Sequence, residues 1–183
     1  SQVLVGLSTT SPAKRAVYNA AMSIGRNAAR RRWAGREDAT TGLMGSAARS
    51  IAFARVLNKL GLDKLELAIS GAAPLPQETA ALWQIWGVNL VEAYGQTETG
   101  GAFISGQARR FARPGNIGTV VSGWEVKLDD EGQILVKGPD QFEGYWNQPD
   151  ATREIVGQDG YVRTGDVGEW KDGNLRIIDR ARD

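Results

Sequence analysis

Residues 65–100 read LELAISGAAPLPQETAALWQIWGVNLVEAYGQTETG, and this stretch decides the fold. Residues 65–69 form a short apolar run typical of a buried strand, and residues 89–94 form a second one. Between them, residues 76–86 repeat apolar side chains at helical spacing, and Gly87 stands where this helix should end. A strand, a crossover helix and a second strand predict a βαβ unit with two neighbouring parallel strands.

Each predicted strand is followed by a loop of small or polar residues. The first loop, residues 70–74, reads SGAAP, and the second, residues 95–101, reads GQTETGG. Ligands of open α/β sheets bind beyond the carboxyl ends of the strands, so the two loops are candidates for one binding site. The alternative for the first loop is a tight turn in which Pro74 and Pro76 merely start the helix.

Two helices are predicted before this unit. Ser11 and Pro12 give a start signal for a helix over residues 12–32. A second helix is predicted over residues 43–60, ending before Gly61. Its expected apolar stripe consists of Leu43, Ala47, Ile51, Ala54, Leu57 and Leu60.

A basic cluster surrounds the end of the first predicted helix. Its members are Arg26, Arg30, Arg31, Arg32 and Arg36. One reading is a solvated face that the helix dipole favours, and the other is a contact with phosphate or anionic lipid. The second reading would bring the protein to the periphery of a membrane.

Helical periodicity stops after about residue 113, and turn residues become frequent. The segment DDEG at residues 129–132 is placed to join strands 124–128 and 133–137 as a hairpin. The segment KDGN at residues 171–174 is placed to join strands 167–170 and 175–178. The second half is therefore predicted to be a small antiparallel sheet or barrel.

Composition narrows the chemistry. The 183 residues include no cysteine and no histidine, which argues against disulfides, serine–histidine hydrolysis and zinc hydrolysis. The formal net charge of +1 gives no reason to expect a nucleic-acid partner. No apolar stretch approaches the roughly 20 residues that span a bilayer. A cytoplasmic protein, soluble or peripheral to a membrane, is expected.

The residues after the second predicted strand suit a nucleotide. The ring of Tyr94 offers a face for stacking a base, and Gly95 lets a ligand approach the backbone. Thr97 offers a hydroxyl to a phosphate oxygen, and Glu98 is a hard oxygen ligand for Mg²⁺. A polar loop without a ligand has the same appearance, so this segment alone leaves both readings open.

Two further acidic residues are candidates. Asp166 follows a glycine at the start of a predicted strand, and a fixed carboxylate there can accept both hydroxyls of a ribose. A turn aspartate looks the same. Glu92 could accept a hydrogen bond from an adenine amino group, or it could be exposed and idle.

Six segments, in this order, resemble motifs of the adenylate-forming superfamily. They are SGAAPLP at residues 70–76, YGQTET at 94–99, GQILVKGP at 132–139, GYW at 144–146, YVRTGD at 161–166 and IIDRARD at 177–183. The resemblance runs from about Gly61 to the end of the chain. The helices before it are similar to the long-chain acyl-CoA synthetase branch of this superfamily.

The resemblance implies an activity and a set of roles. Such enzymes use Mg-ATP to convert a carboxylate, here a fatty acid, to an acyl-adenylate and pyrophosphate, and then pass the acyl group to coenzyme A. Thr97 would hold the α-phosphate, Glu98 the Mg²⁺, and Asp166 and Arg180 the ribose. The adenine would contact Gly71, Ala72, Ala73, Pro74 and Tyr94. Glu92, Ala93, Gly95, Gln96 and Ile178 would complete the ATP/AMP site, with Gly95 also bordering the acyl tunnel.

A domain organisation also follows from the resemblance. Residues 1–109 would be helices plus the βαβ part of a flavodoxin-like α/β subdomain, and residues 110–183 a β-barrel subdomain ending at the hinge to a C-terminal domain. Three residues differ from the common family pattern: Gln133, Tyr161 and Arg182. None of these differences removes a ligand that the resemblance implies.

Two parts of the family machinery are not found in this sequence. These are the Ser/Thr/Gly-rich phosphate loop and the C-terminal domain with its catalytic lysine. The chain is therefore expected to be a central fragment that does not catalyse alone. Two other readings stay open: an adenylation domain that loads a carrier protein, and a non-catalytic nucleotide-binding or interaction fragment.

Overall fold

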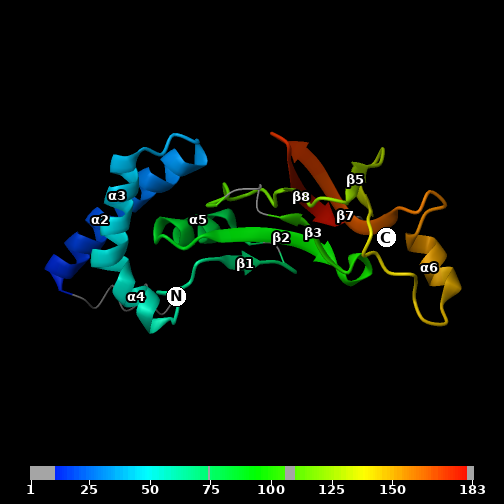
Figure 1. The fold of residues 1–183 in the computed structure, drawn as a ribbon, viewed down its shortest axis with the longest axis horizontal. Helices are drawn as coiled ribbons and strands as arrows, with labels where there is room; N and C mark the ends of the chain where they lie inside the picture. Colours follow the sequence, from blue (N-terminus) through cyan, green and yellow to red (C-terminus); the bar gives the residue numbers. More distant parts are fainter. Residues whose placement is uncertain (1–10, 74, 106–109, 181–183) are drawn as a thin grey trace. The chain divides into compact units, whose positions relative to one another are not determined.

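The computed structural model describes residues 11–73, 75–105 and 110–180. They fall into two compact units (Figure 1). Unit 1 comprises Ser1–Ala68 and Gln77–Leu90, and unit 2 comprises Ile69–Pro76 and Val91–Asp183. Within the described ranges, no helix combines the length and the apolar character that crossing a bilayer requires.

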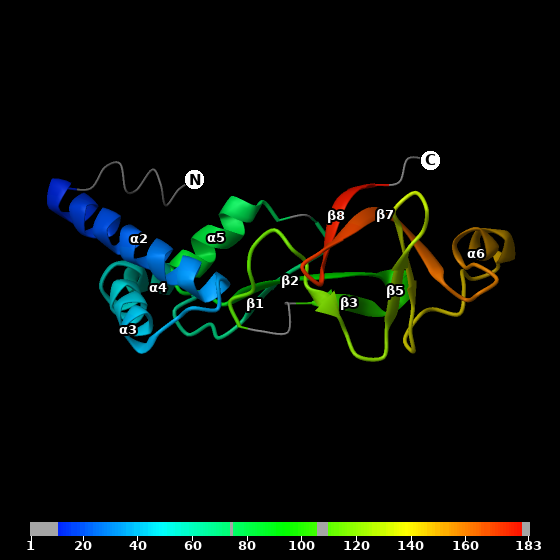
Figure 2. The same cartoon turned by 90° about the horizontal axis from the view of Figure 1, so that it is seen from above.

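Unit 1 is helical. It contains α2 (Pro12–Trp33), α3 (Ala39–Ala48), a π-helical turn (Arg49–Phe53), α4 (Ala54–Lys59) and α5 (Gln77–Ile85). The predicted first helix is confirmed, with Pro12 at its first position. Helices α2 and α5 cross closely (Figure 2). At the crossing, a Cβ added to Gly25 of α2 would lie only 2.7 Å from the carbonyl oxygen of Ile85 in α5.

The apolar stripe predicted for the second helix is confirmed at Leu57, which is fully buried, and is wrong at Leu43 and Ile51, which are 73% and 69% exposed. Phe53, which the stripe did not include, is fully buried. The π-helical turn, Arg49–Phe53, displaces the side chains that follow it around the helix axis, whereas Leu43 precedes the turn and is exposed on α3 itself. A period of 3.6 residues therefore does not run unbroken from residue 39 to residue 59.

Ion pairs hold part of the basic cluster. Arg31 Nη1 lies 2.7 Å from Asp38 Oδ2, and Arg32 Nε lies 2.7 Å from Glu37 Oε1. Asp38 also caps α3 by accepting a hydrogen bond from the backbone N–H of Thr41. These contacts favour the reading of a solvated, ion-paired face over a membrane contact.

A sheet with the order β1-β2-β3-β4 follows. Its strands are β1 (Ala68–Ser70), β2 (Leu90–Gln96), β3 (Gly101–Ser105) and β4 (Thr119–Val120). Ala68 N–H donates to Asn89 O, and further along the chain a Cβ on Gly71 would lie 2.9 Å from Ala93 O. The residue numbers on β1 and β2 therefore increase in the same direction, so the two strands are parallel. The parallel β1–α5–β2 unit predicted from the sequence is thus present, and β3 and β4 join it antiparallel.

The first strand differs from its prediction. It begins at Ala68 rather than at residue 65, and Ile69 is 65% exposed. Among the strands that the structure describes, β1 lies at the edge of its sheet and has a neighbour on one side only, which leaves its side chains less covered than those of a central strand.

A second sheet has the order β5-β6-β7-β8 and is antiparallel. Its strands are β5 (Glu125–Leu128), β6 (Gln133–Lys137), β7 (Val162–Lys171) and β8 (Asn174–Arg180). Both predicted hairpins are confirmed, although β7 and β8 are longer than expected. Helix α6 (Pro149–Ile155) was not predicted, because its seven residues carry no apolar stripe.

One core serves unit 2. Its fully buried members are Phe103, Ile104, Ile134, Val136, Val162 and Leu175. Because Phe103 and Ile104 belong to β3, the strands after β2 pack with the second sheet. The expected boundary at residues 109/110 adjoins residues outside the described ranges and stays a prediction. The chain is a mixed α/β structure with a curved antiparallel sheet, and the flavodoxin-like and closed-barrel details stay predictions too.

Candidate nucleotide site

Asp166 is the centre of the candidate site. It lies on β7 with only 6% of its surface exposed, and the hydroxyl of Tyr94 donates to its Oδ2 at 2.5 Å. Tyr94 and Asp166 are 72 residues apart in the chain. The structure thus joins two of the segments from which the sequence predicted a nucleotide site.

Gln96 and Thr164 also hold Asp166 in place, Gln96 through the carboxylate and Thr164 through the backbone. Gln96 Nε2 donates to Thr164 O at 2.6 Å and lies 3.5 Å from Asp166 Oδ2. The Thr164 hydroxyl donates to Ile134 O and accepts from the backbone N–H of Asp166 at 3.2 Å. The position of Asp166 is therefore fixed from both its side chain and its backbone.

Arg180 faces Asp166 from the neighbouring strand. The two residues are register partners on β7 and β8, and Arg180 Nε lies 3.3 Å from Asp166 Oδ1. The Arg180 side chain is 86% exposed, so it presents its remaining donors to solvent or to a ligand. Ile178, two residues earlier on β8, is also exposed.

The loop after β1 lies along β2. Gly71, Ala72 and Ala73 are exposed, and Gly71 packs against Ala93 so tightly that a Cβ would meet its carbonyl oxygen. Ala72 has φ +65°, a left-handed conformation that costs a residue with a Cβ roughly 1 kcal/mol or more. Strain of this kind clusters at ligand-binding turns. Pro74 lies outside the described residues.

Glu92 is half-buried rather than exposed and idle. Burial raises the pKa of its carboxyl, and a hydrogen bond from the backbone N–H of Gly115 partly offsets this. Gly95 lies at a bulge in the pairing of β2 with β3, directly after Tyr94.

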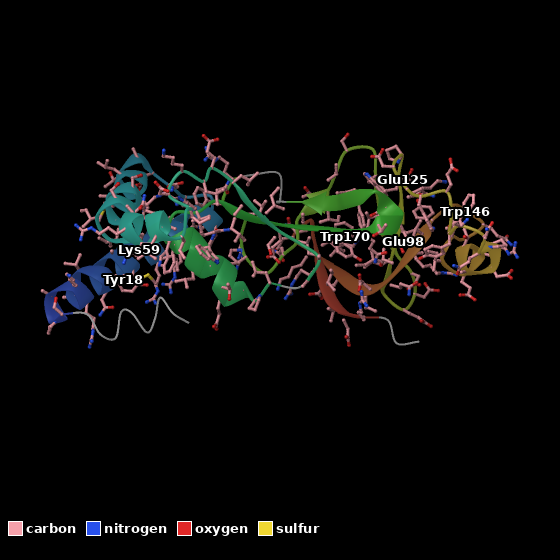
Figure 3. The ribbon with its side chains drawn as sticks, turned by 90° about the horizontal axis from the view of Figure 1, so that it is seen from below. Tyr18, Lys59, Glu98, Glu125, Trp146 and Trp170 are labelled. Atoms are coloured by element: carbon pink, nitrogen blue, oxygen red, sulfur yellow. The ribbon has the colours of Figure 1, made fainter. Side chains whose placement is uncertain are left out.

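Thr97 and Glu98 lie on a one-turn helix, Thr97–Thr99, that follows β2. Thr97 is exposed, and the carboxylate of Glu98 accepts a hydrogen bond from the hydroxyl of Tyr145 at 2.7 Å. Gly100, with φ +63°, ends this turn, and a Cβ there would lie 2.4 Å from Asp140 O. Figure 3 labels Glu98 and also Trp146, which belongs to the loop that carries Tyr145.

The environment of Tyr94 makes its phenol a weaker acid than an ordinary tyrosine. Burial, and then the hydrogen bond to Asp166, raise the pKa of Tyr94 well above the ordinary tyrosine value. The neutral phenol of Tyr94 stabilises the folded protein. This contribution is fully present below the ordinary tyrosine pKa, and it is lost as the pH rises through the raised pKa of Tyr94 in the folded state.

We therefore expect Tyr94 to stay protonated in the folded protein up to about pH 11, beyond the ordinary tyrosine pKa of about 10. An alkaline titration of tyrosinate absorbance should give the same amplitude in this range for the wild type and for Tyr94→Phe. A variant amplitude that is lower by one tyrosine would show that Tyr94 ionises normally.

The sequence profile of the AMP-binding enzyme family matches residues 15–146, which is most of the chain and includes the loops after β1 and β2. The chain belongs to the AMP-binding enzyme family. The chain is 34% identical over 137 residues to a putative fatty-acid–CoA ligase of Mycobacterium tuberculosis. It is 37% identical over 146 residues to long-chain-fatty-acid–CoA ligase 5 of Mus musculus.

These matches cover 74% and 72% of the chain, but the chain spans only 24% and 21% of the two relatives. Solved structures agree with the assignment. An anthranilate CoA ligase in complex with anthranoyl-AMP is 29% identical with a TM-score of 0.60, covering 66% of this chain and 25% of that one. A malonyl-CoA ligase product complex with methylmalonyl-CoA and AMP is 33% identical with a TM-score of 0.54, covering 70% and 31%.

Two residues that contact the predicted site, Thr164 and Tyr145, were not expected there from the sequence. Thr164 supports Asp166, and Tyr145 binds Glu98. Both stand inside segments that resemble family motifs, YVRTGD and GYW, so the motif was the available signal. The contact that each residue makes depends on chain folding and could not be derived from spacing.

Proposed function

We propose that the protein to which this chain belongs is an ATP-dependent fatty acid–CoA ligase. It would convert a fatty acid and ATP to an acyl-adenylate and pyrophosphate, and then transfer the acyl group to coenzyme A. The observation that carries this proposal is the Asp166 network. It holds a buried carboxylate, fixed by Tyr94 and Gln96, beside the exposed guanidinium of Arg180.

Asp166 and Arg180 are suited to a ribose. A carboxylate has about four acceptor sites, so Asp166 can keep its protein contacts and still accept a ribose hydroxyl. Arg180 can donate from nitrogens that do not face Asp166. Because Tyr94 and Gln96 already hold the carboxylate, little side-chain entropy is lost when the nucleotide binds.

The residues around the end of β2 would hold the rest of ATP. The loop with Gly71, Ala72, Ala73 and Pro74 and the ring of Tyr94 would contact adenine, together with Glu92 and Ala93. Thr97, exposed directly after Gln96, would donate to the α-phosphate. Gly95, which has no side chain, would leave room for the carboxylate substrate next to that phosphate.

Glu98 fits the needs of a Mg²⁺ ion. No cluster of three or more acidic, histidine or cysteine ligands occurs in the part of the chain that the structure describes. Mg²⁺ bound with nucleotides commonly takes one or two carboxylates plus phosphate oxygens and water, and Glu98 can supply one such carboxylate. When bound, Mg²⁺ would neutralise charge on the phosphates and polarise them for attack.

No protein nucleophile is required for this chemistry. The substrate carboxylate would attack the α-phosphorus, and pyrophosphate would leave with the bonding electrons. The tasks left to the protein are to align the two reactants and to neutralise developing charge. A chain without cysteine or histidine can perform both tasks.

The test is a two-stage assay on the full-length natural protein. With ATP, Mg²⁺ and a fatty acid, we expect pyrophosphate release and a trapped acyl-adenylate by mass spectrometry. Addition of coenzyme A should then release AMP and yield acyl-CoA. An adenylate that transfers to a carrier protein but not to coenzyme A would replace the ligase with a loading enzyme. Absence of pyrophosphate release with every carboxylate supplied would refute the proposal.

A further inference from the structure

The loop at residues 140–146 makes three separate approaches to the one-turn helix that carries Glu98. Phe142 N–H donates to Glu98 O at 2.9 Å, and the Tyr145 hydroxyl donates to Glu98 Oε1 at 2.7 Å. The third approach is at Gly100, where Asp140 O would lie 2.4 Å from an added Cβ. The loop thus holds both the backbone and the side chain of Glu98.

The loop itself is held in place independently of Glu98. Tyr145 N–H donates to the hydroxyl of Thr152 at 2.9 Å, and Gln148 N–H donates to Tyr145 O at 3.2 Å. The rings of Phe142 and Tyr145 meet edge to face with centroids 5.1 Å apart. A Cβ on Gly144 would lie 2.9 Å from the Thr152 side chain, so the chain runs close to α6. The phenol of Tyr145 is therefore presented to Glu98 by an ordered support.

We propose that Tyr145 is a positioning residue for the metal-binding carboxylate of Glu98, which holds one carboxylate oxygen so that the other is directed to a nucleotide-bound divalent cation. This inference rests on the metal role proposed above for Glu98. Residues that hydrogen-bond to a metal ligand fix its orientation and commonly change metal affinity when they are mutated.

A phenol is well suited to this task. As a neutral donor, it orients the carboxylate without cancelling the negative charge that attracts a divalent cation. An ammonium or guanidinium in the same place would compete with the cation for that charge.

The chain supplies a matched control. Tyr161, in the same unit, donates to Glu125 Oε2 at 2.5 Å, which is also a tyrosine–glutamate hydrogen bond near the surface. Neither residue is assigned a role in binding or catalysis. Tyr161→Phe therefore removes the same chemical contact at a place where no metal is expected.

The experiment uses the full-length protein and a non-hydrolysable ATP analogue, with Mn²⁺ as the spectroscopic probe for the divalent ion. Free Mn²⁺ measured by electron paramagnetic resonance gives the metal affinity without turnover. We expect Tyr145→Phe to weaken Mn²⁺ binding about 3- to 10-fold, somewhat less than the 10- to 100-fold typical of outer-shell contacts because this one is partly exposed. Glu98→Gln should weaken it more, and Tyr161→Phe should not change it.

A kinetic measurement separates positioning from general damage. In Tyr145→Phe, the Mg²⁺ concentration for half-maximal pyrophosphate release should rise by the same factor, while kcat at saturating Mg²⁺ and the thermal midpoint stay near the wild-type values. Normal metal affinity in Tyr145→Phe together with weak affinity in Glu98→Gln would overturn the inference and leave the proposed function standing. Equal losses in Tyr145→Phe and Tyr161→Phe would also overturn it. Normal affinity in Glu98→Gln would instead refute the metal role on which the inference rests.

Discussion

Asp166→Ala in the full-length protein is expected to weaken ATP binding by about 1.5–3 kcal/mol, the range for hydrogen bonds to a charged group. That corresponds to about a 10- to 150-fold rise in Kd. The carboxylate is the buried centre of the candidate site, and the substitution removes the acceptor of Tyr94 and the partner of Arg180 together. It therefore affects both the proposed ribose contact and the groups that shape it.

The measurement is isothermal titration calorimetry with ATP and with adenosine. Adenosine should lose nearly as much affinity as ATP, because the proposed contact is to ribose rather than to phosphate. Asp159→Ala is the control, since Asp159 is an aspartate of the same unit whose exposed side chain pairs with Lys127 at 2.8 Å. A fall in affinity of less than about twofold for Asp166→Ala, well below the expected range, would end the ribose assignment.

The same substitution also leaves a half-buried hydroxyl on Tyr94 without its acceptor. Removing one partner of a buried hydrogen bond costs about 1–3 kcal/mol of stability. Asp166→Asn separates this effect from binding, because the amide oxygen can still accept from Tyr94 while the negative charge is gone. Its stability should lie closer to the wild type than that of Asp166→Ala, and its ATP affinity should be low in both.

Local patterns in the sequence were sufficient for much of the fold. The βαβ unit and both hairpins follow from apolar periodicity and from turn residues within short stretches of the chain. The errors occur where tertiary structure overrides the pattern. Leu43 and Ile51 were expected in the core but are exposed, and Ile51 lies within a π-helical turn that interrupts the helical period. Ile69 was expected to be buried but lies on an edge strand.

The candidate site divides in a similar way. Residue type and the position after a strand were enough to nominate Tyr94, Glu98 and Asp166 as chemically suitable groups. Their partners were not predictable, because each contact closes a long loop of chain. The Tyr94–Asp166 hydrogen bond spans 72 residues, and the Glu98–Tyr145 hydrogen bond spans 47. Only the folded arrangement shows that Tyr145 reaches Glu98.

The core of unit 2 connects stability to this site through Phe103. Phe103 is fully buried on β3, and its ring contacts two other aromatic rings. The Tyr94 ring meets it nearly edge-on with centroids 5.0 Å apart, and the Trp124 ring lies 5.5 Å away on a tilted plane. A void at this position would remove packing directly behind the tyrosine that donates to Asp166.

Phe103→Ala is therefore expected to lower the free energy of unfolding by about 3–5 kcal/mol, the range for removing a fully buried phenylalanine ring. Because Tyr94 loses its support, ATP affinity should fall as well. Trp146→Ala is the control: its side chain is 87% exposed, so the change should stay within about 0.5 kcal/mol. Urea denaturation followed by circular dichroism measures both variants on the full-length protein. A loss below about 1 kcal/mol for Phe103→Ala would mean that the neighbouring rings collapse into the space, and the proposed support of Tyr94 would then be wrong.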